Sequence, residues 1–404
     1  MDVDKPRIRF KGYTDAWEQC KLGEIAEIVG GGTPNTNVDA YWDGDIDWYA
    51  PAEIGEQIYL KSSQRKITKE GLNKSSAKIL PIGAVLFTSR AGIGKTAILT
   101  HEGCTNQGFQ SIVPQKDKLD SYFIFSRSEE LKRYGETVGA GSTFVEVSGK
   151  QMANMYLMMP KTMEEQQIIG AYFARLDHLI TLHQRKCDET KKLKKYMLQK
   201  MFPQNGANVP EIRFDGFTDA WEQRKLNDIS EIVTGTTPPT KEKNNYGGVK
   251  LFVSPADIQS NRYVNNTITT LTDKGFDLGR KLRPGTSLFV SIGSTIGKVA
   301  QIKDFATTNQ QINAVIPFEF MDDDYIFSML EKEATTIKRL SAQQAVPIIN
   351  KRTFGEIEIM YPSKEEQKKI GRYFTELDHL ITLHQRKCNG LKKIRKFMLQ
   401  NMFV

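Results

Sequence analysis

The chain repeats most of its own sequence. Residues 7–34 and residues 211–238 are identical at nineteen of 28 positions when they are aligned at a constant offset of 204. The segment LDHLITLHQRKC occurs at residues 176–187 and again at residues 377–388. Solenoid repeats recur about every 20–50 residues, so a period this long is typical of a duplicated domain. We therefore predict a pseudo-two-fold molecule made of two copies of one unit, a globular module followed by a helix.

The length and composition agree with two soluble domains. A chain of 404 residues has room for two to three domains, each with its own core, and the duplication favours two. The N-terminal segment MDVDKPRIRF lacks the apolar core of a signal peptide, and no run approaches the ~18 apolar residues of a membrane span. The cysteines, Cys20, Cys104, Cys187 and Cys388, are too few and too scattered for a disulfide framework. We therefore expect a cytoplasmic protein with no membrane partner.

The charge balance permits a polyanionic ligand. The formal net charge is +8 and the sequence pI is about 9.0, which is compatible with nucleic acid without requiring it. A pseudo-two-fold protein suits a ligand with two similar ends, and duplex DNA is one such ligand.

Residues 163–202 and 364–404 have the pattern of long helices. The first stretch contains no proline, and its apolar or small residues recur in steps of mostly four and three, which indicates a coiled-coil seam. The predicted seam residues are Ile169, Phe173, Leu176, Ile180, His183, Cys187, Thr190, Leu193, Met197 and Met201, and then Ile370, Phe374, Leu377, Ile381, His384, Cys388, Leu391, Ile394, Met398 and Met402. A helix about 60 Å long with one apolar stripe needs a partner, and its own duplicate is the obvious one. Either orientation is possible, and an antiparallel pair fits a two-fold axis best. Residues 203–210 are the predicted linker.

The globular modules, residues 1–160 (module 1) and 211–362 (module 2), are predicted as mixed α/β (α+β) domains. The expected strands and helices include Ala84–Phe87, Thr286–Val290, Asp120–Tyr134 and Asp323–Arg339. Matched sequence islands recur through both modules, whereas residues 55–79 and 115–140 diverge from their counterparts. A shared scaffold with different intervening surfaces indicates two related modules that recognise different things.

The segment SRAGIGKT at residues 89–96 only partly resembles a phosphate-binding loop. A Walker A motif needs a glycine where Ser89 stands, and the second copy has Val299 in place of the final hydroxyl residue. Two interpretations remain open. One is a glycine-rich turn that presents Lys95 and Lys298 to a polyanion, and the other is a plain structural turn.

The pairs His183–Cys187 and His384–Cys388 each place two metal-ligand types four residues apart on one helix face. An antiparallel helix pair could bring all four together as a tetrahedral zinc site. The alternative, which we prefer, is that small or semi-polar seam residues set the helix register.

Two further patterns are interpreted as structural. Lys and Arg cluster in the distal half of each helix, as a solvated helix face usually does. They are Arg185, Lys186, Lys191, Lys192, Lys194, Lys195 and Lys200, and then Arg386, Lys387, Lys392, Lys393, Arg395 and Lys396. Trp17 and Trp221, in the matched DAWEQ segments, are predicted to be core or docking anchors.

Catalytic motifs are missing from both copies. The sequence contains no Asn-Pro-Pro-Tyr/Phe tetrapeptide of an amino-methyltransferase, no Gly-x-Ser-x-Gly elbow and no HExxH. A duplicated enzyme would usually keep its chemistry in at least one copy. We therefore expect a non-catalytic protein with no catalytic residue and no metal of its own.

Taken in order, the motifs resemble the DNA-specificity subunit of a Type I restriction–modification system. The resemblance covers essentially the whole chain and occurs twice. It rests on Trp-Glu-Gln-x-Lys-Leu…Gly-x-Thr-Pro, on the Thr-Asn-Gln island at 105–107 and 308–310, and on the helix entry at Pro160, Glu164–Gln166, Ile169–Gly170 and Leu176–Ile180, with its copy at Pro362, Glu365–Gln367, Ile370–Gly371 and Leu377–Ile381.

That resemblance implies two target-recognition domains carried on an antiparallel pair of long helices. Each domain would read one half of a split, asymmetric sequence in double-stranded DNA. The helices would measure the unread spacer and dock two methyltransferase subunits. Those subunits would use S-adenosylmethionine, and two further restriction/translocase subunits would use ATP and Mg. The specificity subunit itself would need no cofactor.

Candidate contact residues follow from loop position and chemistry, because polar side chains read base edges and fix the register on phosphates. The candidates for DNA contact are Thr33, Asn35, Arg90, Lys95, Gln107 and Thr143 in module 1, and Thr237, Lys241, Ser294, Lys298, Gln310 and Gln343 in module 2. Asn106–Gln107 and Asn309–Gln310 occur in both copies, so a scaffold role is an alternative for them. The candidates for partner docking, predicted on the outward face of the helices, are Asp177, His178, Gln184, Arg185, Asp378, His379, Gln385 and Arg386.

Three competing hypotheses belong to other classes. The chain could be a stand-alone sequence-specific DNA-binding regulator, although the long matched helices count against it. It could be an NTPase that uses residues 92–96, or a scaffold that binds only proteins.

Overall fold

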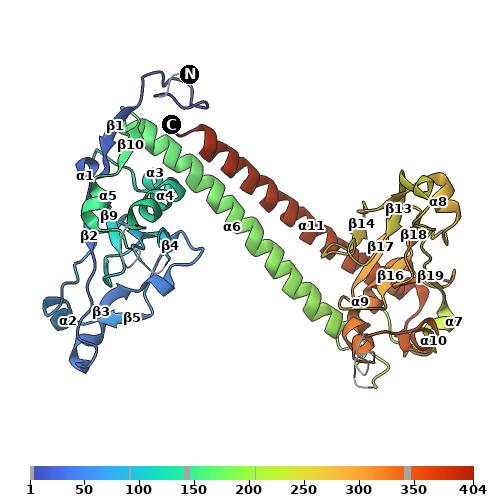
Figure 1. Cartoon of the computed structure of the whole chain (residues 1–404). Helices are drawn as coiled ribbons and strands as arrows, with labels where there is room; N and C mark the ends of the chain where they lie inside the picture. The colour runs from blue at the N-terminus through green and yellow to red at the C-terminus, as the bar shows by residue number, and fades with distance from the viewer. Residues whose placement is uncertain (1–3, 91, 141–145, 205, 341–346) are drawn as a thin grey trace. The chain divides into compact units, whose positions relative to one another are not determined.

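The computed structural model of the chain describes residues 4–90, 92–140, 146–204, 206–340 and 347–404. It divides into two compact units. The first unit comprises Met1–Leu182 with Cys388–Val404, and the second comprises His183–Lys387. The division falls inside the two long helices, so each unit contains one module and a stretch of both helices (Figure 1).

Each module is built on three small sheets of the same topology. In module 1 a five-stranded sheet has the order β2-β9-β6-β7-β4, a three-stranded sheet has the order β5-β3-β8, and β1 pairs with β10. The second module repeats these orders as β12-β19-β16-β17-β14, β15-β13-β18 and β11-β20. The mixed α/β class and the duplicated architecture predicted from the sequence are therefore confirmed.

The elements of module 1 are β1 (Glu18–Lys21), α1 (Leu22–Ile25), β2 (Ala26–Gly30), η1 (Asp39–Tyr41), β3 (Trp42–Tyr49), η2 (Pro51–Glu53), β4 (Tyr59–Leu60), β5 (Arg65–Ile67), α2 (Lys69–Asn73), β6 (Val85–Phe87), β7 (Thr96–Leu99), β8 (Gly103–Thr105), β9 (Gln110–Pro114), α3 (Ser121–Ser126), α4 (Ser128–Gly139), α5 (Gly149–Ala153) and β10 (Tyr156–Met159). The strand expected at 84–87 is present as β6. The helix expected at 120–134 is divided into α3 and α4 at Arg127, whose backbone leaves the helical region.

The elements of module 2 are β11 (Glu222–Lys225), α7 (Leu226–Ile229), β12 (Ser230–Thr234), η3 (Lys243–Asn245), β13 (Tyr246–Val253), β14 (Tyr263–Val264), β15 (Thr270–Leu271), α8 (Asp273–Asp277), β16 (Ser287–Val290), β17 (Val299–Ile302), β18 (Ala306–Thr308), β19 (Ile312–Pro317), α9 (Asp323–Leu340), α10 (Lys351–Gly355) and β20 (Glu358–Tyr361). Here the predicted strand at 286–290 and helix at 323–339 are both found.

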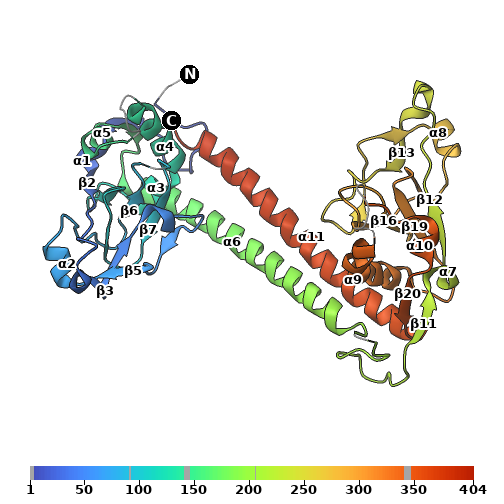
Figure 2. The ribbon, with the colours of Figure 1, turned by 60° about the horizontal axis from the view of Figure 1, so that its bottom comes forward.

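The two long helices are α6 (Met163–Lys200) and α11 (Lys364–Asn401), of 38 residues each. In the second unit, His183 of α6 contacts His384, and Lys194, further along α6, contacts the earlier residue Asp378. Residue numbers rise on one helix as they fall on the other, so the predicted antiparallel pairing is confirmed within this unit. Figure 2 shows the same two helices side by side from a second direction.

The predicted seam holds at Cys187 and Cys388, which are both buried, and again at Met201 and Met402, which are 2% and 1% exposed. Between these positions Leu193 and Ile394 are 45% and 47% exposed, whereas Lys194 is only 7% exposed. The predicted inward positions of Leu193 and Ile394 are therefore wrong. The seam moves by one residue because a buried aspartate on the opposite helix draws in a cation.

Each module core is completed by an aromatic residue that follows a long helix. In the first unit the Phe403 ring stacks on Phe173 at 5.7 Å and contacts Trp17 at 6.2 Å. In the second unit Phe202 stacks on Tyr325 at 5.7 Å and meets Trp221 edge-on at 5.9 Å. Both tryptophans are buried, which confirms their prediction as core anchors.

Candidate nucleic-acid interface

The glycine-rich loop after β2 is held against the neighbouring loop of module 1. A Cβ added at Gly31 would lie 2.0 Å from the carbonyl oxygen of Asn106, so only glycine fits there. The Trp48 indole Nε1–H donates to the carbonyl of Gly32 at 2.8 Å, and the Trp42 Nε1–H donates to the carbonyl of Asn35 at 3.2 Å. Two buried indoles of the three-stranded sheet therefore fix the path of residues 31–35.

Several polar candidates of module 1 lie on residues 31–35 and on the neighbouring loop at residues 106–108. These two loops, with the indoles that hold them, are called the loop frame below. The Thr33 hydroxyl is hydrogen-bonded to the Gln107 side chain, and the Asn35 side chain accepts from the Asn37 N–H at 3.0 Å. The Asn106 side chain accepts from the Gly108 N–H at 2.8 Å, which closes the second loop on itself. The structure therefore brings together Thr33 and Gln107, places Asn35 on the same loop as Thr33, and gives Asn106 a scaffold contact.

Module 2 repeats the arrangement with some exchanged residues. The Thr237 hydroxyl donates to Gln310 Oε1 at 2.6 Å, as the equivalent of the Thr33–Gln107 contact. A Cβ at Gly235 would lie 2.2 Å from the carbonyl oxygen of Asn309. Tyr246, which stands where module 1 has Trp42, donates its hydroxyl to the carbonyl of Pro238 at 2.6 Å. The frame is common to both modules, so the frame itself cannot distinguish two different ligands.

The glycine-rich turns after β6 and β16 present their lysines differently. Lys95 is exposed, whereas Lys298 Nζ donates to the carbonyl of Ile258 at 3.0 Å. Lys298 therefore has a contact within module 2, and the role of both lysines toward a polyanion stays a prediction. The first turn joins strand β6 to strand β7, whereas a nucleotide-binding loop leads from a strand into a helix.

The other loop candidates have varied settings. Arg90 is half-buried and its backbone pairs with Glu146. Lys241 and Ser294 are exposed. Thr143 and Gln343 lie outside the residues that the structure describes.

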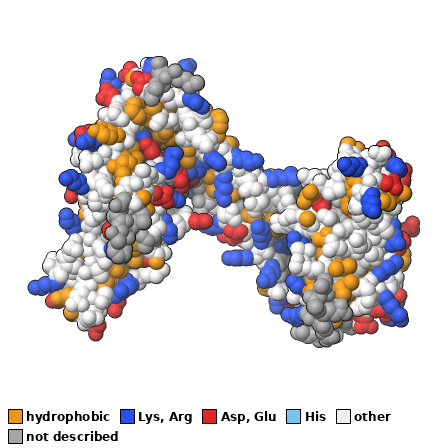
Figure 3. Space-filling view, in the orientation of Figure 1, with side chains coloured by type: hydrophobic (Ala, Val, Ile, Leu, Met, Phe, Trp, Pro, Cys, Tyr) orange, Lys and Arg blue, Asp and Glu red, His pale blue; other side chains and the backbone are white. Residues whose placement is uncertain are grey.

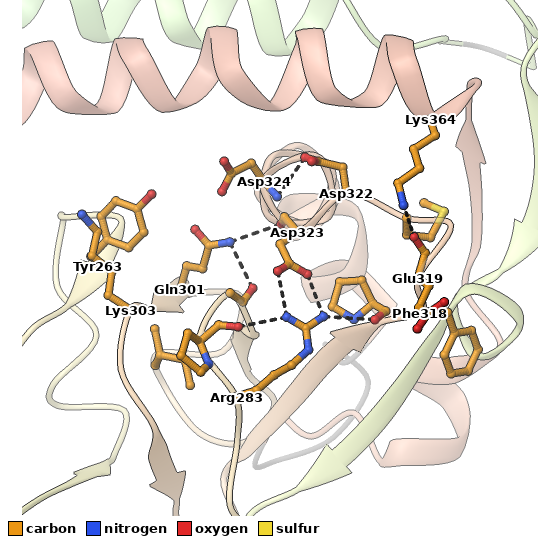
Figure 4. Close-up of a pocket in the computed structure, with 15 residues that line it drawn as sticks. Tyr263, Arg283, Gln301, Lys303, Phe318, Glu319, Asp322, Asp323, Asp324 and Lys364 are labelled. Carbon is orange, nitrogen blue, oxygen red and sulfur yellow. Dashed lines mark hydrogen bonds and ion pairs between the residues drawn. The ribbon is translucent and has the colours of Figure 1, made fainter.

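Module 2 also contains a cavity of about 700 Å³ beside the start of α9 (Figure 4). Arg283 forms a two-point ion pair with Asp323 at 2.8 and 2.9 Å, and Gln301 donates to the carbonyl of Asp323 at 3.2 Å. Burial raises the pKa of Asp322, although this carboxylate also accepts the Tyr325 N–H at 2.9 Å and caps the helix. These polar groups satisfy one another, so we interpret this cavity as structural.

Two aspartates predicted on the outward face of the helices are instead buried. Asp378 is 9% exposed and accepts from Lys194 Nζ at 2.6 Å. Asp177 is 7% exposed and accepts from Arg395 Nε at 2.5 Å. The prediction of an outward face is wrong for both. The prediction of a solvated face is wrong for Lys194, which is 7% exposed, and only partly holds for Arg395, whose side chain is 25% exposed.

The two buried aspartates are supported differently by their modules. The Tyr122 hydroxyl of α3 donates to Asp177 at 3.0 Å, and burial followed by the aspartate charge raises the pKa of Tyr122. In module 2, Arg262 approaches Asp378 at 3.5 Å and pairs with Asp324 at 2.6 Å. Lys194 and Arg395 occupy equivalent positions in the two copies, each beside the predicted seam. This matched pair of cations is the sequence signal for the contacts with Asp378 and Asp177.

The remaining docking candidates lie at the surface. His178, Arg185, His379 and Arg386 are exposed, while Gln184 and Gln385 are half-buried. In the face drawn in Figure 3, Lys and Arg side chains gather along the long helices, as expected for a solvated basic surface. Two matched pairs of apolar side chains on the long helices are also exposed. Leu193 and Tyr196 are 45% and 49% exposed on α6, and Ile394 and Phe397 are 47% and 54% exposed on α11.

The two seam histidines contact each other in the second unit. His183 Nδ1 and His384 Nδ1 are 3.0 Å apart. Desolvation, together with Lys186 and Lys387, lowers the pKa of both rings, and His183 further lowers that of His384. Within the described residues, no group of three or more His, Cys, Asp or Glu side chains is arranged to hold a metal ion. No helix in the described part of the chain is long and apolar enough to cross a membrane.

Two copies of one α/β scaffold, each with polar loop residues on a shared hydrogen-bonded frame, define a tandem recognition protein. The sequence pattern of the family described as "Type I restriction modification DNA specificity domain" matches residues 14–192 and 218–393. The chain belongs to this family.

Individual relatives agree with that membership. The chain is 26% identical over 404 aligned residues to the "Type I restriction enzyme MjaIX specificity subunit" of Methanocaldococcus jannaschii, which covers 96% of this chain and 92% of that one. It is 31% identical over 162 residues to the "Type I restriction enzyme HindI specificity subunit" of Haemophilus influenzae, which covers 38% of this chain and 35% of that one. The crystal structure of the Type I restriction–modification S subunit from M. genitalium shares the fold, with a TM-score of 0.70, 13% identity and 99% of each chain covered.

Proposed function

We propose that this chain is the non-catalytic sequence-reading subunit of a Type I restriction–modification complex. Each module reads one half of a bipartite, asymmetric target in double-stranded DNA. The observation that carries the proposal is the repeated loop frame, in which Thr33–Gln107 and Thr237–Gln310 make the same contact while the surrounding segments differ. A common frame positions each reading surface, and the unshared side chains give each module its own sequence.

In this proposal the chain has no cofactor of its own and works in the cytoplasm. Two methyltransferase subunits supply the chemistry with S-adenosylmethionine, and two restriction/translocase subunits use ATP and Mg. The paired helices set the length of unread DNA between the two half-sites. Their antiparallel pairing within each unit supports this role, because the aspartate and histidine contacts fix the register.

We also propose that the methyltransferase subunits dock on the two matched apolar pairs of the helices. Leu193 with Tyr196 and Ile394 with Phe397 occupy equivalent positions in the two copies, and all four side chains are exposed. Exposed aromatic and aliphatic groups ringed by charge are typical of protein interfaces. Two equivalent surfaces suit two copies of one partner. His178, Arg185, His379 and Arg386 would form the polar rim.

The decisive experiment is to co-express the chain with its native methyltransferase subunit in a host that lacks adenine methylation. N6-methyladenine is then mapped over the host genome at single-base resolution. We expect one motif with two unlike halves and a fixed gap. Replacing residues 211–362 by a foreign module should change one half only. A stable complex that leaves no motif would contradict the proposal, and specific DNA binding by the chain without methylation would favour the regulator hypothesis.

A further inference from the structure

Arg65, the first residue of β5, stacks on the two tryptophans of the three-stranded sheet. Its guanidinium carbon lies 3.6 Å from the Trp42 ring centroid and 5.8 Å from that of Trp48. The two indoles meet edge to face with 5.1 Å between their centroids, and they are only 8% and 5% exposed. Arg65 is itself exposed and pairs across the strands with Trp48. A buried aromatic platform therefore holds a flat cation at the surface.

The N–H groups of the Arg65 guanidinium are available to a ligand. Among the residues that the structure describes, none accepts a hydrogen bond from the Arg65 side chain, and no carboxylate forms an ion pair with it. Its neighbour Lys66 shows the contrast, because Lys66 Nζ lies 3.4 Å from the Asp47 carboxylate. Stacking restricts the plane of a guanidinium and leaves its N–H fork free for a planar acceptor pair.

The platform connects Arg65 to the candidate interface. Trp42 and Trp48 are the residues whose indole N–H groups hold the carbonyls of Asn35 and Gly32. Arg65 therefore packs on the same side chains that fix the glycine-rich loop. The guanidinium is thus a neighbour of the loop that bears Thr33 and Asn35.

Module 2 has other aromatic residues at the two tryptophan positions and no cation at the position of Arg65. At the constant offset of 204, Tyr246 stands for Trp42, Phe252 for Trp48 and Thr269 for Arg65. The Tyr246 hydroxyl still holds its loop through the carbonyl of Pro238 at 2.6 Å. A hydrogen bond from the sheet to the loop therefore occurs in both modules, whereas an arginine at this position of the sheet occurs in module 1 and not at the equivalent position of module 2.

The segment around Arg65 is also more basic than the equivalent segment of module 2. Residues 61–78 contain six Lys or Arg and one Glu, whereas residues 265–282 contain three Lys or Arg and two Asp. A basic surround favours approach to the DNA backbone but carries no base information by itself. The unshared group that does carry base information is a planar, pre-positioned guanidinium, because an Arg fork matches the O6 and N7 acceptors of guanine in the major groove.

We propose that Arg65 reads a guanine in the half-site of module 1, with Trp42 and Trp48 setting the plane of its guanidinium. The proposal rests on the proposed function and names a residue that distinguishes the two half-sites. It places the reading surface of module 1 on the β5–β3–β8 sheet together with the loop at residues 31–35. Module 2, with Thr269 at the equivalent position, must read its half by other side chains.

The test uses the methyltransferase complex of the full chain and the genome-wide methylation map. The module swap over residues 211–362 first assigns the halves of the motif. Arg65→Ala should relax one G·C position in the half of module 1, so that discrimination at that position falls about 5- to 150-fold, while the other half is unchanged. Arg65→Lys keeps the charge but loses the planar fork, so it should relax the same position to a smaller degree. Lys69→Ala, which removes an exposed cation from the same segment, is the control and should leave every position unchanged.

Each other outcome overturns the proposal in a recognisable way. A half-site of module 1 without a G·C pair rules out the guanine contact. Uniformly weaker methylation with an unchanged motif, restored by Arg65→Lys, indicates a phosphate contact instead. Loss of the whole half together with a lower melting temperature in both Arg65 variants indicates a structural clamp on the tryptophans. If the unsubstituted complex yields no bipartite motif, the proposed function itself fails, which is a separate result.

Discussion

The ammonium nitrogen of Lys194 lies 2.6 Å from a carboxylate oxygen of Asp378, and both side chains are buried within the second unit. Lys194 also contacts Glu331, and Arg262 approaches Asp378 from module 2 at 3.5 Å. The pair therefore joins both long helices and the module they carry. Separating buried charges is costly, but each member of this pair has a second counter-ion, Glu331 for Lys194 and Arg262 for Asp378.

We predict that Asp378→Asn destabilises the second unit by roughly 1–3 kcal/mol. This is less than the roughly 3–5 kcal/mol for leaving a buried charge uncompensated, because Lys194 keeps Glu331 and Arg262 keeps Asp324. The measurement is the urea unfolding midpoint of the full chain. Asp188→Asn, which changes an exposed aspartate on α6, is the matched control and should stay within about 0.5 kcal/mol of the parent. Equal effects of the two substitutions would show that the buried contact does not hold the unit together.

Acid should weaken the contact between the two histidines. The folded-state pKa of His183 and His384 lies below the ordinary value, so the unfolded chain binds more protons as the pH falls through about 6.5. Stability is then complete above that pH and declines below it. A doubly protonated pair also has no acceptor nitrogen for the hydrogen bond.

The measurement is the thermal midpoint of the second unit between about pH 7.5 and pH 5. His384→Gln should reduce this pH dependence, because glutamine does not titrate in that range. His379→Gln, which changes an exposed histidine of the same helix, should retain the dependence of the parent chain. A parent protein whose midpoint is constant over this range would disprove the prediction.

The close approach of the glycine-rich loop should make it intolerant of any side chain. In Gly235→Ala the new methyl group would lie 2.2 Å from the carbonyl oxygen of Asn309, and forcing an extra carbon into a packed site costs about 1–3 kcal/mol. Gly390→Ala is the control, since its added carbon meets nothing within 4 Å and a helical alanine stabilises by about 0.5–1 kcal/mol. Calorimetry should show opposite shifts in the two variants. A neutral Gly235→Ala would mean that the loop can move away from its frame.

Loss of one apolar pair on the helices should remove one methyltransferase subunit. In Tyr196→Glu a charge replaces an aromatic group that is 49% exposed, and Phe397→Glu does the same on the other helix. We expect each variant to bind one methyltransferase subunit and the double variant to bind none, as measured by native mass spectrometry. Val249→Glu, at a side chain that is 88% exposed on β13, should still bind two. Full occupancy of the double variant would place the docking surface elsewhere.

Periodicity and repetition predict the main features of the fold, and they fail where a contact depends on a distant partner. The duplication, the strands β6 and β16 and the anchors Trp17 and Trp221 are all apparent in the sequence. The inward turn of Lys194 is not, because it depends on Asp378, which lies far along the chain. The different settings of Lys95 and Lys298 are hidden for the same reason, since the carbonyl that binds Lys298 belongs to another loop.

At the candidate interface, too, the sequence predicts some features and not others. Matched positions identify Thr33 and Gln107 together with their copies, but the sequence does not reveal that the two side chains contact each other. Arg65 carries no motif, and its two-indole platform forms only when β3 pairs with β5. The divergence of residues 55–79 was the available signal, because it marked the segment in which the two modules differ.

The ion contacts of Asp177 with Arg395 and of Asp378 with Lys194 bear on the origin of the chain. Asp177 and Asp378 stand at equivalent positions, and so do Lys194 and Arg395. Each helix therefore donates one carboxylate and receives one, which is an isologous contact of the kind found in homodimers. Both members of the contact are thus present in each half of the sequence, which is what a duplication of a self-pairing chain of half the length would produce. In such a chain the loops of either half could change without altering these helix contacts.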